Sequence, residues 1–251
     1  MTERDFAVKL AQAAGKTMLK NFSLGMKKQW KEDNSPVTAT DHAINQMVIE
    51  EIKKAYPDMS ILGEEASHMI EGSEYTWVCD PIDGTVPFAY GVPTSVFELA
   101  LVKDGEPILG IIYDPFLDRL FEAQKGQGAL LNGQPIHVSD AKSFKLNIAG
   151  AGEPSMIAAL YENGARAMNV LSIAYVSALV ASGELVAAIA YTWAGPWDIA
   201  AVKLIVEEAG GTVTSLDGKE QRYDQKINGA AISNGYLHES LLEIIKAKNK
   251  G

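Results

Sequence analysis

Between residues 97 and 136 the chain alternates short apolar runs with glycine-containing turns, and this pattern restricts the fold more than any other feature of the sequence. The runs at 97–102 and 108–113 are joined by a turn that contains Gly105, and another tight turn follows at 132–133. Glycine at such turns is typical of β-hairpins. The segment therefore predicts an antiparallel meander whose apolar side chains need covering layers.

Helical patterns precede and follow this meander. Residues 3–22 place apolar side chains at helical spacing, and Thr40 or Asp41 is positioned to cap a second helix. In the second half, helix and strand patterns alternate, and the clearest helix begins near Trp197 and ends at a glycine pair. The predicted class is α/β, with alternating layers of helices and sheets that bury all of these faces.

The change of pattern suggests two halves within one compact unit. The first, residues 1–143, holds the meander and two acidic motifs, Gly-Glu-Glu and Asp-Pro-Ile-Asp-Gly-Thr. The second, residues 144–251, holds the motif Trp-Asp-Ile-Ala-Ala. A length of 251 residues suits two such closely joined halves.

Composition excludes several classes of function. The net charge of −10 argues against nucleic-acid binding, because phosphate backbones attract lysine and arginine. The single cysteine, Cys79, permits neither an intrachain disulfide nor a thiolate zinc site. Charges occur from the first residues onward, unlike a signal peptide, and no apolar run approaches the roughly 20 residues that span a membrane. A cytoplasmic protein without membrane contact is expected.

Acidic residues stand at the ends of the predicted strands and helices. Glu64 follows a short strand, Asp80 and Asp83 follow the apolar run 75–79, and Asp198 opens a helix. Carboxylates held close together repel one another, and cations between them would keep them ionised. Mg²⁺ fits such a site, because it takes oxygen ligands and keeps waters that phosphate oxygens can replace.

The turn from Asp80 to Thr85 also suits a phosphate. Pro81 stiffens it, and Gly84 removes the side chain where a phosphate would approach. The backbone N–H groups of Gly84 and Thr85 would then face the ligand, as at a helix N-terminus. Taken singly, each motif has a simpler explanation, because acidic turns and aspartate caps are common.

The order of these motifs is more specific than any one of them. VTATD, GEE, DPIDGT, WDIAA and EEAGG follow one another as in the inositol monophosphatase family, which the chain resembles from about Phe6 to its last helix. The resemblance implies an αβαβα sandwich. It also implies a Mg²⁺-dependent, lithium-sensitive phosphomonoesterase, acting as a homodimer on a small phosphorylated alcohol such as inositol-1-phosphate.

The resemblance assigns metal ligands to this chain. Glu64, Asp80 and the backbone carbonyl of Ile82 would bind one Mg²⁺. Asp80, Asp83 and Asp198 would bind a second, and Glu64 with waters a third. The site would thus hold two or three ions, which prepare the attacking water and support the leaving oxygen.

The resemblance also assigns the catalytic residues. Asp41 would hydrogen-bond Thr85, and this pair with Glu64 would orient and deprotonate the attacking water. No side chain is needed as a covalent nucleophile.

The substrate positions match the family less closely. Asp83, Gly84, Thr85, Ser172 and Tyr191 are the expected substrate contacts. Ser172 can bind a hydroxyl, whereas Tyr191 stands where relatives often carry an acidic residue that grips a diol. A leucine at 171 replaces a small glycine. The metal apparatus is complete, and the contacts specific to inositol are not.

Three alternatives stay open. The substrate could be fructose-1,6-bisphosphate or histidinol phosphate, with the same mechanism. A catalytically silent, metal-binding regulatory protein is the alternative from another class, although such a relative should have lost part of the acidic set. Trp193 and Trp197 could either stack on a ligand or pack in the core.

Overall fold

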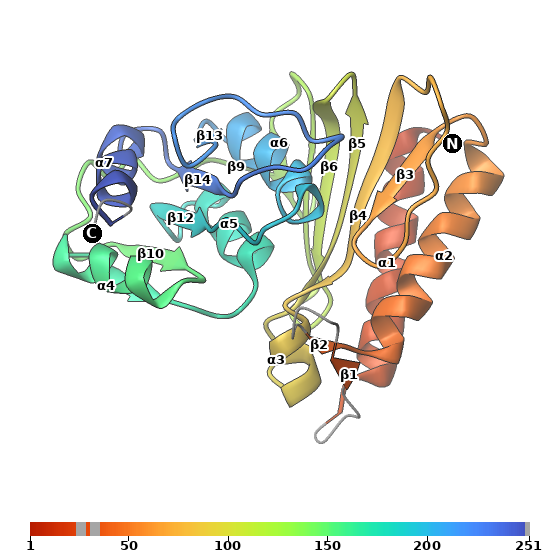
Figure 1. The fold of residues 1–251 in the computed structure, drawn as a ribbon, viewed down its shortest axis with the longest axis horizontal. Coiled ribbons are helices and arrows are strands. Elements are labelled where there is room, and N and C mark those ends of the chain that lie inside the picture. Colours follow the sequence, from red (N-terminus) through yellow and green to blue (C-terminus); the bar gives the residue numbers. More distant parts are fainter. Residues whose placement is uncertain (24–28, 31–35, 249–251) are drawn as a thin grey trace.

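A computed structural model describes residues 1–23, 29–30 and 36–248 of the chain. Two helices, a seven-stranded sheet, a second pair of helices, a five-stranded sheet and a third pair of helices follow one another as layers (Figure 1). The predicted αβαβα arrangement is confirmed.

The first layer consists of α1 (Glu3–Asn21) and α2 (Ala39–Ala55). A capping box begins each helix, formed by Thr2 with Asp5 in α1 and by Thr38 with Asp41 in α2. Both helices bury one apolar stripe against the seven-stranded sheet. The cap of α2 therefore fixes Asp41 at the edge of this layer.

The seven-stranded sheet is built from consecutive strands in the order β3-β4-β5-β6-β7-β8-β9. β3 runs parallel to β4, and every other neighbouring pair is antiparallel, so the predicted meander is confirmed. Gly105 in the β5–β6 turn has a φ of +88°, which suits glycine. The strands are β3 (Ser60–Gly63), β4 (Tyr75–Asp83), β5 (Val96–Lys103), β6 (Glu106–Asp114), β7 (Arg119–Gln124), β8 (Ala129–Leu131) and β9 (Gln134–Ile136).

The end of β4 differs from the prediction. The sequence indicates a strand that stops before an acidic turn, yet β4 continues through Asp83. Its pairing with β5 shifts between Asp80 and Asp83, which accommodates Pro81 and its missing N–H. A short helix, α3 (Thr85–Tyr90), follows at once, with Gly84 as its cap.

The middle layer contains α5 (Ile173–Ala181) and α6 (Ala200–Glu208). Both pack against both sheets and belong to the largest apolar cluster, so each is apolar on nearly every side. A 3₁₀ turn, η1 (Pro196–Asp198), precedes α6, which therefore begins two residues after Asp198.

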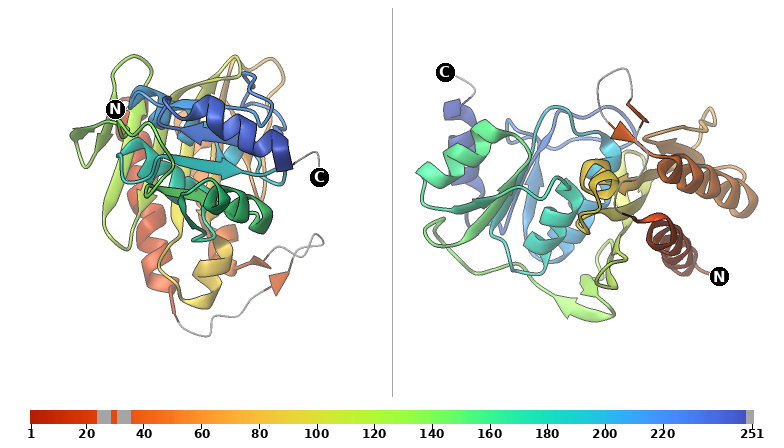
Figure 2. Two further views of the ribbon diagram at one scale, coloured as in Figure 1. Left: turned by 90° about the vertical axis from the view of Figure 1, so that its left-hand side faces the viewer. Right: turned by 90° about the horizontal axis from the view of Figure 1, so that it is seen from below.

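The five-stranded sheet has the order β11-β10-β12-β14-β13, and α4 and α7 cover its outer face (Figure 2). β10 is parallel to β11 and β12, and the remaining pairs are antiparallel. A small sheet pairs β1 (Gln29–Trp30) with β2 (Pro36–Val37). The remaining elements are β10 (Ile148–Ala151), α4 (Pro154–Glu162), β11 (Arg166–Met168), β12 (Ala187–Ala190), β13 (Thr212–Thr214), β14 (Ala230–Ser233) and α7 (His238–Lys248).

The two large sheets lie on either side of the expected boundary between 1–143 and 144–251 in the sequence. The central apolar cluster takes side chains from both halves. The division into two halves stays a prediction. No helix in the described part of the chain combines the length and apolar character needed to cross a membrane.

Candidate active site

A cavity of about 590 Å³ opens where β4, α3, α5 and η1 meet. It is called the carboxylate cavity below. Residues from both halves of the chain line it: Glu64, Asp80, Ile82, Asp83, Gly84, Thr85, Val86, Ala151, Gly152, Asn169, Leu171, Ser172, Ile173, Val176, Trp193, Trp197 and Asp198.

Three carboxylates converge at this cavity. Asp80 and Asp83 come from the end of β4, and Asp198 comes from η1. One carboxylate oxygen of each residue lies within 4.8 Å of a carboxylate oxygen of each of the other two. All three residues are buried. A hydrogen bond from the Gly195 N–H to the Asp198 carboxylate holds that side chain in its turn. The fold thus gathers residues that lie more than a hundred positions apart.

Burial and mutual repulsion act on these groups. Burial first, and then the charges of Glu64 and Asp198, raise the pKa of Asp80 well above its usual value. Burial raises the pKa of Asp83 to about 6, although hydrogen bonds from Ser172 and the Ala174 N–H oppose this shift. Bound cations would relieve both effects. The all-oxygen donor set fits a hard divalent ion such as Mg²⁺.

Two further predicted ligands lie beside these carboxylates. Glu64 follows β3 directly, is half-buried and lines the cavity. The Ile82 N–H donates to Asp80 Oδ1 at 2.8 Å, and the carbonyl oxygen of Ile82 lies 3.1 Å from Thr85 Oγ1, where it competes with Asp41 for the single hydroxyl hydrogen of Thr85. All five side chains or carbonyls predicted as metal ligands are therefore at one cavity.

Thr85 is also hydrogen-bonded to Asp41, with its Oγ1 3.1 Å from Asp41 Oδ1. The second carboxylate oxygen of Asp41 accepts hydrogen bonds from the N–H and hydroxyl of Thr38. Burial raises the pKa of Asp41, and the bonds from Thr38 and Thr85 oppose that shift. The capping box of α2 thus orients the carboxylate that Thr85 contacts.

Gly84 is required for reasons that the sequence did not reveal. Its φ is +86°, a conformation that favours glycine. A Cβ at this position would lie 2.9 Å from the Cβ of Ser172 and 3.1 Å from the carbonyl oxygen of Leu171. The cap residue of α3 therefore packs directly against the residues that precede α5.

Ser172 lies at the cavity, as expected, but its hydroxyl has protein partners. Its Oγ donates to Asp83 Oδ2 at 2.6 Å and accepts from the Tyr175 N–H at 3.2 Å as the cap of α5. The Ala174 N–H donates to the same Asp83 oxygen at 2.7 Å. The first turn of α5 thus positions Asp83.

Tyr191 differs from the other expected substrate contacts. It is not among the residues that line the carboxylate cavity, and it packs against the apolar cluster between the second sheet and its outer helices. Trp197 lines the cavity and also packs against the central core. Trp193 lines the cavity with 60% of its surface exposed, so it is not a core residue.

Glu98 is a charged residue near the site that the sequence analysis missed. It lies opposite Asp80 on β5 and is fully buried, and the backbone N–H groups of Ala201 and Val202 at the start of α6 are its nearest hydrogen-bond donors. Burial and the nearby charges of Asp83 and Asp198 raise its pKa well above the usual value. The feature of the sequence that could have identified Glu98 is that it is the one acidic residue within the apolar run 96–102.

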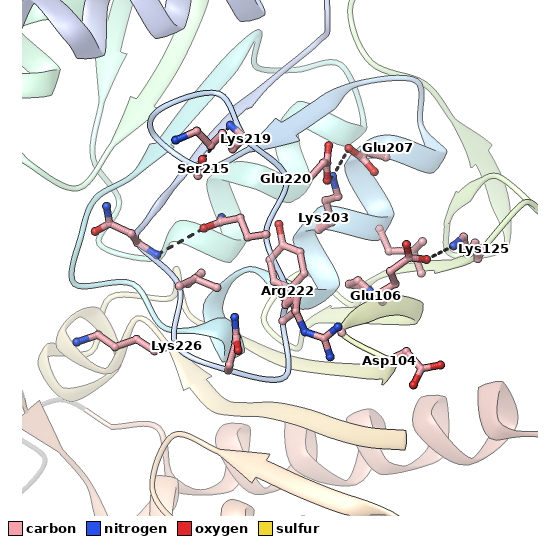
Figure 3. Close-up of a pocket in the computed structure, with 18 of the residues that line it drawn as sticks. Asp104, Glu106, Lys125, Lys203, Glu207, Ser215, Lys219, Glu220, Arg222 and Lys226 are labelled. Carbon is pink, nitrogen blue, oxygen red and sulfur yellow. Dashed lines mark hydrogen bonds and ion pairs between the residues drawn. The ribbon is translucent and has the colours of Figure 1, made fainter. Parts of the chain in front are cut away.

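A larger cavity, of about 1170 Å³, lies between the β5–β6 turn, α6 and the loop 215–228 (Figure 3). It is called the charged cleft below. Lys203 Nζ lies between Glu207 and Glu220, 2.7 Å from an oxygen of each, and Lys125 pairs with Glu106. Three acidic groups of the cleft, Glu106, Glu207 and Glu220, thus have a lysine partner within the protein.

Comparisons with known proteins agree with this geometry. Residues 2–250 match the inositol monophosphatase family. A fructose-1,6-bisphosphatase/inositol-1-monophosphatase of Thermotoga maritima is 32% identical, over 98% of this chain and 96% of that protein. A histidinol-phosphatase of Chlorobaculum parvum is also 32% identical, over 95% of each protein.

A solved structure extends the agreement to the fold. The structure of a Thermotoga maritima IMPase superposes with a TM-score of 0.91 at 30% identity, and the match covers 100% of this chain and 99% of that one. The converging carboxylates and these matches support one conclusion. The chain belongs to the inositol monophosphatase family and is a metal-dependent phosphomonoesterase.

Proposed function

We propose that this protein uses Mg²⁺ to release phosphate from monoesters of small alcohols, of which inositol-1-phosphate is one example. The proposal rests on Asp80, Asp83 and Asp198, whose buried carboxylates lie within 4.8 Å of one another. No lysine, arginine or histidine is among the described residues that line this cavity. The carboxylates therefore need cations from solution to remain ionised together.

The metal ligands of this proposal are those expected from the sequence. Glu64, Asp80 and the carbonyl of Ile82 would hold one ion. Asp80, Asp83 and Asp198 would hold another, and Glu64 with waters a third. When bound, the ions provide a nucleophilic water at neutral pH, neutralise phosphoryl charge and support the leaving oxygen.

The protein's own groups would handle the proton. Thr85 donates its hydroxyl hydrogen to Asp41 at 3.1 Å, which leaves a lone pair of Oγ1 available to accept from the attacking water. Asp41 accepts from Thr38 on its other side and is thereby fixed in orientation. Glu64 at the cavity wall would be the second acceptor for that proton.

The phosphate would rest against the backbone of Gly84 and Thr85, with Asp83 beside it. Ser172 would contribute mainly by holding Asp83, to which its hydroxyl already donates. A substrate contact by Tyr191 would require that side chain to leave its packing beside the outer helices. Fructose-1,6-bisphosphate and histidinol phosphate are the alternative substrates, in line with the names of the Thermotoga and Chlorobaculum relatives.

Three properties of the whole protein belong to the same proposal. It would act in the cytoplasm as a homodimer. Lithium would inhibit it by occupying a weak metal position. The mass of the protein in solution tests the homodimer. Turnover measured against rising Li⁺ at fixed Mg²⁺ tests inhibition by lithium, and a rate that does not change with Li⁺ would contradict it.

The test of the proposal is phosphate release with Mg²⁺ from a panel of inositol, sugar, amino-alcohol and nucleotide monophosphates. Asp198→Asn should abolish release. Asp217→Asn is the matched control, because Asp217 is an exposed aspartate of the charged cleft. Absence of release from every ester, or full activity of Asp198→Asn, would overturn the proposal.

A further inference from the structure

The carboxylate cavity offers little to bind a second phosphate. Its lining contains four acidic side chains, Glu64, Asp80, Asp83 and Asp198, and no basic side chain among the described residues. Ions bound by these acids would neutralise the reacting phosphate and leave no charge for a second one. A second anionic group on the substrate would find no basic partner among the described lining residues, and like charges nearby would repel it.

The cavity also has few groups for the hydroxyls of a polyol. Asn169 has a fixed orientation, because Oδ1 accepts from the Leu171 N–H at 2.7 Å and Nδ2 donates to the Gly152 carbonyl at 3.2 Å, which leaves one N–H and one lone pair for a ligand. Thr85 and Ser172 donate their hydroxyl hydrogens to carboxylates. A hydroxyl that leaves water without a partner lowers affinity.

Apolar and aromatic side chains line the rest of the cavity. They are Val86, Leu171, Ile173, Val176, Trp193 and Trp197. Trp193 is 60% exposed, although it reaches into the lining of this cavity. An indole left open to water beside a reaction site is suited to stacking on a flat ligand group.

Gly152 holds the Trp193 ring in place. A Cβ at residue 152 would lie 2.7 Å from Cζ2 of Trp193, so the indole rests directly on the backbone after β10. Leu171, with a φ of +61° and about half of its surface exposed, adds an apolar side chain to the same lining. These residues are specific features of this cavity and none is a metal ligand.

We infer that, among small phosphomonoesters, the preferred substrate is the ester of an alcohol that carries one planar aromatic ring and no second anionic group. The ring stacks on the indole of Trp193 while the carboxylate side of the cavity handles the phosphate. A positive charge on the ring is tolerated, because an indole face attracts cations. The inference rests on the proposed phosphatase function and specifies its substrate class.

The test compares two esters of primary alcohols, 2-phenylethyl phosphate and glycerol-1-phosphate, with fructose-1,6-bisphosphate as the doubly anionic ester. The measured quantity is the ratio of kcat/KM for the aromatic ester to that for the glycerol ester. It should exceed about ten in the wild type, and the bisphosphate should be the poorest substrate. Trp193→Ala should lower the ratio about tenfold, which corresponds to about 1.4 kcal/mol.

Two more variants separate stacking from general damage. Trp193→Phe should keep most of the wild-type ratio that Trp193→Ala loses, because phenylalanine also presents an aromatic face. Gly152→Ala should lower the ratio with the indole still present, because the new methyl group displaces it. Tyr161→Ala is the control, since Tyr161 is an exposed aromatic residue of α4 and does not line the cavity.

The outcomes distinguish this inference from the proposed function. Hydrolysis of all esters with a wild-type ratio near one would overturn the inference and leave the phosphatase intact. A ratio that Trp193→Ala leaves unchanged would do the same. Failure to hydrolyse any ester with Mg²⁺ would overturn the proposed function, and the inference with it.

Discussion

The carboxylate cavity and the charged cleft both contain acidic side chains, but they balance charge differently. In the charged cleft, the amino group of Lys203 is 2.7 Å from Glu207 and from Glu220, and also donates to the Val213 carbonyl. In the carboxylate cavity, Asp80 and Asp83 have no basic partner among its described lining residues. A site whose charges balance internally needs nothing from solution, whereas the carboxylate cavity requires cations.

The same helix serves both regions. Asp198 stands just before α6, and Lys203 follows within the first turns of that helix. The turn before α6 thus completes the acidic site, while Lys203, five residues later, forms the ion pairs of the charged cleft. Substitutions in the two regions should therefore separate stability from catalysis.

Metal removal gives the largest expected difference between the two regions. Chelation with EDTA should lower phosphate release at least about a thousandfold, or roughly 4 kcal/mol of barrier, because the charge on the phosphate is no longer neutralised. Added Mg²⁺ should restore it. The measurement is initial rate against free Mg²⁺, and substantial turnover in the chelated enzyme would contradict the comparison.

Asp83→Asn should have the next largest effect. It removes a carboxylate at the centre of the acidic group while keeping the shape that Ser172 and the Ala174 N–H contact. We expect kcat to fall by several orders of magnitude. The matched control is Glu220→Gln in the charged cleft, where the side chain is 76% exposed and turnover should stay within about twofold.

The sequence alone determines part of the fold and part of the candidate site. Local patterns predicted the meander, the layered helices and the acidic residues at strand and helix ends, because periodicity and turns are properties of short segments. They could not predict that β4 continues past Pro81, since this depends on the shifted pairing with β5.

The direction in which side chains point was harder to predict than the helices and strands. Tyr191 directly follows β12, and the sequence alone does not determine which apolar cluster its ring joins. Glu98 was overlooked because a single acidic residue in an apolar strand carries no periodic signal. Its position opposite Asp80 follows from strand register, which is a tertiary property.

Lys203→Met should affect stability and spare the metal site. The substitution leaves the carbonyl of Val213 without its donor and removes the cation from between Glu207 and Glu220. We expect a loss of about 1–3 kcal/mol in the free energy of unfolding, measured with urea. The loss should be the same with and without Mg²⁺, and a Mg²⁺-dependent loss would show that the two regions are coupled.

The smallest expected effect concerns pH in the metal-free protein. Burial raises the pKa of Asp83 from 3.8 to about 6, so the folded state holds a proton that the unfolded state releases between these values. The stability that this proton provides is complete below pH 3.8 and is lost as the pH rises through 6. Asp83→Asn should therefore become more stable relative to the wild type by about 2 kcal/mol between pH 4 and pH 7.

Urea unfolding of both proteins in EDTA, from pH 4 to pH 7, measures this difference directly. Comparing the two proteins cancels the titration of distant groups that they share. The pKa values of Asp80 and Glu98, which the charge of Asp83 raises, should be lower in the variant, and their titration contributes to the measured difference. Saturating Mg²⁺ should reverse the sign at pH 7, because only the wild type keeps all its carboxylates and gains stability from the bound ions. If the difference in unfolding free energy does not change with pH, ionisation of Asp83 does not destabilise the metal-free fold. The carboxylate cavity would then not need cations, and it would not differ in this respect from the charged cleft, whose charges are paired within the protein.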